Sequence, residues 1–215
     1  MTDKLSSAIA ETQTKAGHIV EAPNERRQHG LSAVLDSGQW ARHALKAGDY
    51  AIEFCLPDRQ GKKVSLAKSL LSGPVMLIVS QGGCHDNVRT QLLDLAAVYP
   101  QMRSRSVTLI VLAPRWDIAD IDELPFATLV DSHCSVATVY GLALQGGGPT
   151  RPHAESIGGG ETDADLAEPL VLPATYVISR SGEIVFASID ANAAHYLQPV
   201  ALLRMLEALS RRQDF

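Results

Sequence analysis

Apolar and polar positions along the chain follow two different periods, and the changes of period mark the predicted elements. Residues 75–80 form a near-continuous apolar run, which is typical of a strand buried on both faces of a parallel sheet. From Val88 the apolar residues recur three and four positions apart, as in an amphipathic helix, and residues 107–112 form a second apolar run. A strand, a helix and a strand within about 40 residues predict a right-handed crossover between parallel strands.

The remaining elements of the predicted domain show the apolar spacing of their type. They are a hairpin of residues 51–56 and 62–66, a strand over 127–130, a helix over 133–140, a hairpin of 174–178 and 183–187, and a closing amphipathic helix through 202–209. Cys55 falls within the first of these strands, where we expect a small buried side chain. Residues 145–170 lack periodicity between two glycine runs, which predicts a surface loop or a lid over the site.

Residues 1–46 precede this pattern and predict a helical N-terminal extension. Leu31, Val34 and Leu35 have helical spacing, and the following residues are able to continue the helix. Nothing in the chain indicates a second core or internal repeats. We therefore predict one domain over 47–215, with the extension packed against it or against a second subunit.

Composition excludes several classes of function. The chain has 215 residues, 46% of them apolar, and a formal charge of −5, which argues against nucleic acid or an anionic membrane as partner. No run approaches the roughly 18 apolar residues of a membrane span, and the N-terminus lacks a signal pattern, so we predict a cytoplasmic chain. Cys55, Cys84 and Cys134 are an odd, widely spaced set, which favours buried or reactive thiols over a disulfide framework.

Candidate chemistry gathers at the turn after the first apolar run. Gly82 and Gly83 end the strand, and Cys84 and His85 stand where the next helix begins. In open α/β sheets, functional groups lie beyond the carboxyl ends of parallel strands. A helix N-terminus favours a thiolate, although Asp86 opposes it, and an imidazole is suited to proton transfer near neutral pH. The turn therefore predicts a nucleophilic thiol at Cys84 or acid–base chemistry at His85, with a purely structural role open for each.

Four segments, in this order along the chain, are similar to sequence motifs of one family. They are residues 48–58, 61–66, 129–142 and 172–182. Together they resemble the peroxiredoxins, the alkyl hydroperoxide reductase and thiol-specific antioxidant family, over about residues 46–210. The resemblance implies an α/β fold, the thioredoxin-like fold of peroxiredoxin type, with a central mixed sheet flanked by helices.

The turn itself departs from the family motif. The nearest branch carries R-G-x-W-C-P-x-C, and its first cysteine attacks peroxide. Aligned without gaps, His85 stands at the attacking position and Cys84 at the tryptophan position, whereas a one-residue deletion makes Cys84 the attacking thiol. Gln81 replaces the arginine of the motif. The catalytic arginine that other members carry near the last hairpin has no match, since Pro173 and Ala174 stand there.

The resemblance also implies the remainder of the site. Pro173 is similar to the cis-proline that faces the active-site turn across the sheet, and Thr175 would present a hydroxyl to the same pocket. Independently of the resemblance, the place of Gln81, Gly83 and Asp86 at the turn predicts that they contact a small-molecule substrate. The resemblance further implies a hydroperoxide as substrate, an external thiol as reductant, no cofactor, and a homodimer.

A second thiol that resolves an oxidised Cys84 is not expected. Cys134 follows the strand predicted two positions away in the sheet, so the strand ends lie about 10 Å apart. A disulfide needs Cα atoms within about 7 Å, so we expect Cys134 to be a buried filler. Cys84, His85, His133 and Cys134 supply two sulfurs and two nitrogens, but adjacent residues seldom point at one metal, and we expect no metal site.

Three functions remain open from the sequence. The first is a peroxiredoxin-like thiol oxidoreductase that reduces a hydroperoxide through Cys84. The second is a non-redox enzyme of the same fold, as in specialised metabolism, that uses His85 with Asp86 or Gln81 as acid and base on a small organic molecule. The third is a catalytically inactive dimer that serves as a binding module.

Overall fold

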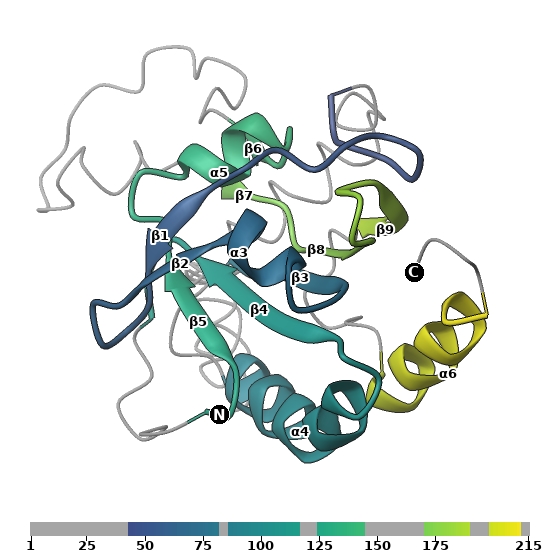
Figure 1. Cartoon of the computed structure of the whole chain (residues 1–215). Helices are drawn as coiled ribbons and strands as arrows, with labels where there is room; N and C mark the ends of the chain where they lie inside the picture. Colours follow the sequence, from purple (N-terminus) through teal and green to yellow (C-terminus); the bar gives the residue numbers. More distant parts are fainter. Residues whose placement is uncertain (1–42, 82–85, 117–123, 145–169, 190–197, 212–215) are drawn as a thin grey trace, which may run out of the picture.

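The computed structural model describes residues 43–81, 86–116, 124–144, 170–189 and 198–211 (Figure 1). The predicted extension and the predicted loop over 145–170 therefore lie almost entirely outside the described residues. Where the extension is described, over residues 43–46, the chain forms a turn and irregular backbone. The amide of Leu45 donates to the carbonyl of Tyr140 at 3.1 Å, so a tertiary hydrogen bond takes the place of a helical one. The prediction of helix up to residue 46 is wrong at these positions.

A five-stranded mixed sheet forms the centre of the fold, in the order β5-β4-β3-β8-β9. β3 (Val75–Val79), β4 (Thr108–Ala113) and β5 (Ala127–Val130) run parallel, as the apolar runs predict. β8 (Ala174–Ile178) runs antiparallel to β3, and β9 (Ile184–Ile189) runs antiparallel to β8. Every residue of β3 is buried, because the strand lies in the middle of a sheet that is covered on both faces.

Helices cover both faces of this sheet. α4 (Asp86–Arg103) and α6 (Pro199–Leu209) lie along its lower side in Figure 1, whereas α3 (Leu66–Leu70) and α5 (Ser135–Val139) pack against the other face. Alternate side chains of β3 point into two different cores, one on each face of the sheet. Leu77 and Val79 pack with α3 and α5, and Met76 and Ile78 pack with α4 and α6. The predicted amphipathic helices are thus confirmed as the covers of the sheet.

Three short elements, α3, β6 and β7, were not predicted. α3 directly follows the hairpin of β1 (Cys55–Pro57) and β2 (Lys63–Ser65). β6 (Ala143–Leu144) pairs with β7 (Leu170–Val171). At the start of α3, the carboxylate of Glu53 accepts from the Ser65 hydroxyl at 2.8 Å and from the Ala67 amide at 2.7 Å. Ser65 is the local N-cap and accepts from the Lys68 amide at 3.3 Å, and the carboxylate of Glu53, 14 positions before Ala67, adds a second acceptor that no local period shows.

Cys55 is exposed, so the expectation that it is buried is wrong. Its neighbours Phe54 and Leu56 both pack in the core that contains α5, and Cys134 belongs to the same core. Because side chains alternate along a strand, the Cys55 thiol points to the opposite side, toward solvent. The two described cysteines are therefore not oriented toward each other.

Two tyrosines are buried in this core, and only one of their hydroxyls makes a hydrogen bond, so we expect loss of each hydroxyl to change the free energy of unfolding differently. The rings of Tyr140 and Tyr176 meet edge to face, with centroids 5.6 Å apart. Burial raises the pKa of both phenols, so both are neutral at ordinary pH. The Tyr140 hydroxyl donates to the Ile52 carbonyl at 2.9 Å, whereas the Tyr176 hydroxyl has no hydrogen-bond partner among the described residues.

We expect Tyr140→Phe to lower the free energy of unfolding by about 1 kcal/mol, because the Ile52 carbonyl loses its donor. Tyr176→Phe should leave it unchanged or raise it, because the variant removes a buried oxygen that makes no bond. Urea unfolding of the two variants, followed by circular dichroism, compares them directly. Equal losses would contradict this assignment of the two hydroxyls.

Candidate functional site

The turn that carries the predicted chemistry connects β3 to α4. Residues 82–85, which include Gly83, Cys84 and His85, lie outside the described residues, so the structure defines the two ends of the turn. β3 ends at Val79, and α4 begins at Asp86 and runs for 18 residues. The turn therefore follows the carboxyl end of a central parallel strand and precedes the N-terminus of a long helix. This is where an open α/β sheet places its ligands.

Two neighbouring strands border the turn. The amide of Ser80 donates to the Leu112 carbonyl at 2.8 Å, so the last residues of β4 lie on one side. On the other side Val79 pairs with Ala174, which places Pro173 next to the end of β3. The proline is half-buried there.

The peptide bond before Pro173 is trans, as are all peptide bonds between described residues, so the cis-proline implied by the resemblance is wrong. Leu172 donates its amide to the Leu142 carbonyl at 2.8 Å and thereby extends the ladder of β6 and β7 to the residue before the proline. Trans is the more common isomer of an X–Pro bond.

Gln81 places an unused donor beside the turn. Continued alternation along β3 puts it on the face of Leu77 and Val79. Its Nε2 atom is buried and has no hydrogen-bond partner within the described part of the chain. A buried amide without a partner costs about 1–3 kcal/mol, so such groups usually mark a missing partner. An oxygen of a substrate in the turn is one group that is able to accept this bond.

Thr175 lies on the other face of the sheet. It pairs with Ile78 and shares that residue's face with Val177, which is the face covered by α4 and α6. The structure therefore does not bring Thr175 and Gln81 together on one face, although both border the same strand. Asp86 is the first residue of α4, and its backbone alone is described.

Neither described cysteine is located at the end of β3. Cys134 is 3% exposed and precedes α5 with a φ of 51°, so the expectation that it is buried is confirmed. It follows β5, which lies two strands from β3, as predicted. Cys55 belongs to the β1–β2 hairpin outside the central sheet. Two strand spacings exceed the reach of a disulfide by about 3 Å.

Asp131 organises the loop between β5 and α5, a role that the sequence analysis missed. Its buried carboxylate accepts from the Ser135 amide at 2.8 Å, the Ser135 hydroxyl at 2.8 Å, the Val136 amide at 2.9 Å and the Ala137 amide at 3.1 Å. These donors are the free N–H groups of a helix start, which prefer a negative charge. The spacing from Asp131 to Ser135 is one turn longer than an ordinary cap, so the usual capping pattern does not identify it.

The four residues considered as metal ligands are described only at His133 and Cys134. His133 is exposed and Cys134 is buried, so these adjacent side chains point in different directions. Among the described residues, no group of three or more His, Cys, Asp or Glu side chains is placed to hold a metal ion. In the same part of the chain, no helix has both the length and the apolar character needed to cross a bilayer.

Comparison with known families identifies the class of protein. The sequence model of the AhpC/TSA family matches residues 47–187, which include β1 to β8 and most of β9. The chain therefore belongs to the AhpC/TSA family, as the motifs imply. No curated protein sequence matches the chain.

Solved structures of peroxiredoxins share the fold at low sequence identity. Peroxidoxin BcpB from Mycobacterium tuberculosis is 17% identical, with a TM-score of 0.58 over 77% of this chain and 98% of that protein. The yeast mitochondrial 1-Cys peroxiredoxin is 17% identical, with a TM-score of 0.57 over 77% of this chain and 76% of that one. Peroxiredoxin 6 of Arenicola marina, as a cysteine-to-serine mutant, is 16% identical, with a TM-score of 0.60 over 77% and 74%. The predicted thioredoxin-like fold of peroxiredoxin type is thus confirmed.

Proposed function

We propose that the protein is a peroxiredoxin-type thiol oxidoreductase that reduces a hydroperoxide through Cys84. The observation that carries the proposal is the position of the turn in a member of the AhpC/TSA family. Cys84 lies between the carboxyl end of β3 and the first residue of α4, at Asp86. The N–H groups of a helix start stabilise a thiolate, which is the form of the sulfur that attacks the O–O bond.

The proposed reaction transfers two electrons from sulfur to oxygen. The Cys84 thiolate attacks one peroxide oxygen, the S–O bond forms and the O–O bond breaks, and the leaving oxygen takes a proton and departs as alcohol or water. Cys84 is then a sulfenic acid. One external thiol displaces water to give a mixed disulfide, and a second thiol releases the Cys84 thiol and carries away the disulfide. An external reductant is required because neither Cys55 nor Cys134 borders the turn.

The neighbours of Cys84 take the supporting roles in this proposal. Gln81 donates its buried, unpartnered amide to the peroxide. His85 supplies the proton to the leaving oxygen, which is general acid catalysis. Gly83 allows close approach of the backbone, and Pro173 borders the site without an N–H that would compete for the substrate. We assign no contact to Thr175, which faces α4 and α6.

A second candidate function is acid–base chemistry by His85 without a redox step. The observation that favours it is the lack of a cation among the described residues that border the turn: Ser80, Gln81 and Pro173 are neutral, and Asp86 is acidic. Arg89 lies within α4 and is exposed. A thiolate benefits from a neighbouring cation, whereas an imidazole near neutral pH does not need one.

Mass spectrometry after a brief peroxide pulse tests the proposed function. Full-length protein is treated for seconds with a small excess of hydrogen peroxide in the presence of dimedone, which traps sulfenic acid, and is then digested. We expect the adduct at Cys84, while Cys134 and the exposed Cys55 stay reduced. Cys55 is the internal control, since exposure alone makes it accessible to peroxide. Equal modification of Cys55 and Cys84, or an inert Cys84, would direct the search to His85 and non-peroxide ligands.

A further inference from the structure

The chain that leaves β4 brings a tryptophan to the same edge of the sheet as the turn of residues 82–85. β4 ends at Ala113, and the amide of Ser80 donates to the Leu112 carbonyl at 2.8 Å, so the carboxyl ends of β3 and β4 lie side by side. Trp116 follows shortly after the end of β4 and is half-buried. The chemistry proposed at Cys84 does not use this side chain.

A hydrogen bond fixes the direction of the Trp116 side chain. Its Nε1 atom donates to the Leu129 carbonyl on β5 at 2.8 Å. Leu129 pairs with Leu112 of β4, which in turn pairs with Val79, the last residue of β3. The indole nitrogen is therefore level with the end of β3 and lies within about two strand spacings of it, or about 10 Å.

The indole lies on the face of the sheet that α4 covers. Trp116 packs against the core that contains Phe126 and also Val88, a residue near the start of α4. The turn of residues 82–85 leads from the end of β3 into α4, and therefore to this same face. Trp116 and the turn thus share one edge and one face of the sheet.

Trp116 offers an apolar surface that is oriented before any ligand binds. The hydrogen bond to Leu129 satisfies the one polar atom of the indole, so the ring surface alone remains for further contacts. The side chain is neither buried nor fully exposed, which leaves part of that ring surface open to solvent. An aromatic surface held in this way packs against an aromatic ring or a branched alkyl group at little cost in side-chain entropy.

We propose that Trp116 is a specificity-determining residue of the site at Cys84, and that its indole packs against the apolar body of an organic hydroperoxide. This inference rests on the proposed function, because it assigns the second half of the same substrate. The two peroxide oxygens lie at Cys84, and the carbon body extends along the carboxyl edge of the sheet toward Trp116. Hydrogen peroxide has no carbon body and makes no contact with the indole.

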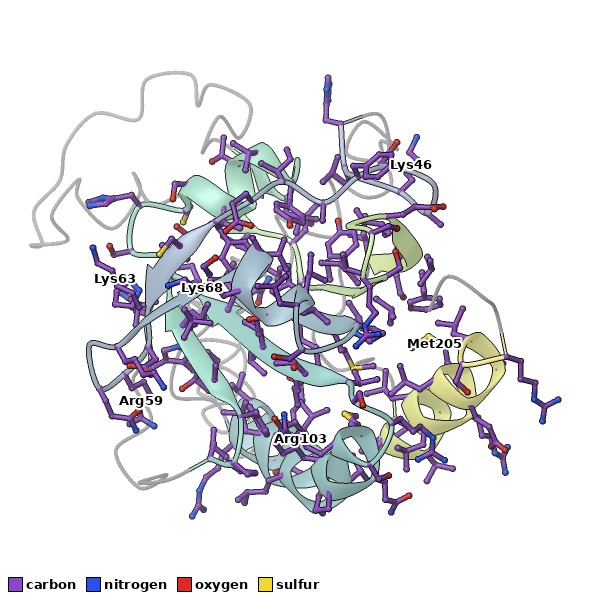
Figure 2. All side chains as sticks on the ribbon, viewed as in Figure 1. Lys46, Arg59, Lys63, Lys68, Arg103 and Met205 are labelled. Carbon is purple, nitrogen blue, oxygen red and sulfur yellow. The ribbon has the colours of Figure 1, made fainter. Side chains whose placement is uncertain are left out.

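The ratio of kcat/KM for cumene hydroperoxide to kcat/KM for hydrogen peroxide measures this contact. We expect Trp116→Ala to lower the ratio about five- to tenfold and Trp116→Phe to lower it about twofold, as the aromatic contact is lost or reduced. A general disturbance of the turn slows both peroxides and leaves the ratio unchanged. Met205→Ala is the matched control and should keep the ratio of the parent protein. Met205 is also half-buried and packs against the same core, but from α6 (Figure 2).

Binding of 2-phenyl-2-propanol, the alcohol product of cumene hydroperoxide, tests the contact without peroxide chemistry. The chain contains two tryptophans, so a nitrogen–proton correlation spectrum of the full-length protein has two indole signals, and Trp116→Phe identifies the signal of Trp116. We expect this signal to shift as the alcohol is added, with Kd on the order of 1 mM.

Three outcomes would overturn the role of Trp116. They are an unchanged ratio in Trp116→Ala, an equal fall of the ratio in Trp116→Ala and Met205→Ala, and a Trp116 signal that does not move at tenfold the expected Kd. Thermal unfolding checks that each variant is folded, and Trp116→Phe decides the case if Trp116→Ala does not fold. A Trp116 signal that moves while Cys84 stays inert to peroxide would refute the proposed function alone, whereas an oxidised Cys84 with an unmoved signal would refute this inference alone.

Discussion

Cys84→Ser is expected to lower kcat/KM for hydroperoxide reduction by a factor on the order of 1,000 or more, because a serine hydroxyl does not form a nucleophilic anion at neutral pH and is not oxidised by peroxide. Consumption of hydrogen peroxide and cumene hydroperoxide in the presence of dithiothreitol measures the loss. Cys55→Ser is the matched control. Its thiol is exposed on the β1–β2 hairpin, so this variant should retain the rate of the parent protein.

Substitutions at Cys84 and His85 separate the candidate functions. If Cys84 is the nucleophile and His85 delivers the proton, His85→Ala should slow the reaction by about 100-fold and Cys84→Ser should remove it. If His85 acts as acid and base without redox chemistry, His85→Ala removes the activity and Cys84→Ser leaves most of it. A protein in which neither change affects any activity or ligand affinity is a binding module. Unchanged peroxide consumption in Cys84→Ser would contradict the proposed function directly.

The central strand β3 was predictable because both of its faces are buried, and a short apolar run between turn residues is typical of such a strand. β3 and β5 were each predicted to within one residue at each end. α6 was predictable because its apolar residues recur on one face, which packs on the sheet. The parallel direction of β3 and β4 followed from the helix between them, which is long enough for a crossover.

The short elements were not predictable because tertiary contacts form them. The start of α3 uses the carboxylate of Glu53, from before the hairpin, in addition to the Ser65 cap, and β6 and β7 have two residues each. Ala44 and Leu45 are apolar, yet the Leu45 amide donates to the Tyr140 carbonyl instead of continuing a helix. The apolar neighbours of Cys55 predict a buried thiol. Strand alternation instead places Phe54 and Leu56 in the core and the Cys55 thiol in solvent. Each of these outcomes depends on distant residues.

The strand and the helix that border the candidate site were predictable from sequence, whereas the faces on which its neighbouring side chains lie were not. The end of a buried strand followed by two glycines and a helix locates the turn from sequence alone. The unpartnered amide of Gln81 supports its place beside the turn. Thr175 was grouped with Gln81 because both border β3, but the parity of the strand register puts it on the opposite face. Motif similarity does not show on which face of the sheet a side chain lies. The residue pairing between β3 and β8 shows it.

Asp131→Ala is expected to lower the free energy of unfolding by about 3 kcal/mol, because it removes a buried acceptor of four hydrogen bonds. The amides of Val136 and Ala137 would remain buried without a partner. Asp131→Asn should cost less, about 1–2 kcal/mol, since an amide oxygen retains part of this set without the charge. Urea unfolding followed by circular dichroism measures both losses.

An exposed aspartate provides the control for this prediction. The Asp49 carboxylate accepts one hydrogen bond, from the Lys46 amide at 2.7 Å, and Asp49→Ala should cost less than about 1 kcal/mol. Loss of the Asp131 cap should also loosen the start of α5, where Cys134 is buried at 3% exposure. Cys134 should then react faster with a thiol reagent in Asp131→Ala than in the parent protein, whereas Asp49→Ala leaves its rate unchanged. Equal stability losses for Asp131→Ala and Asp49→Ala, with Cys134 equally protected in both, would show that packing alone holds this loop and would refute the role of the buried carboxylate.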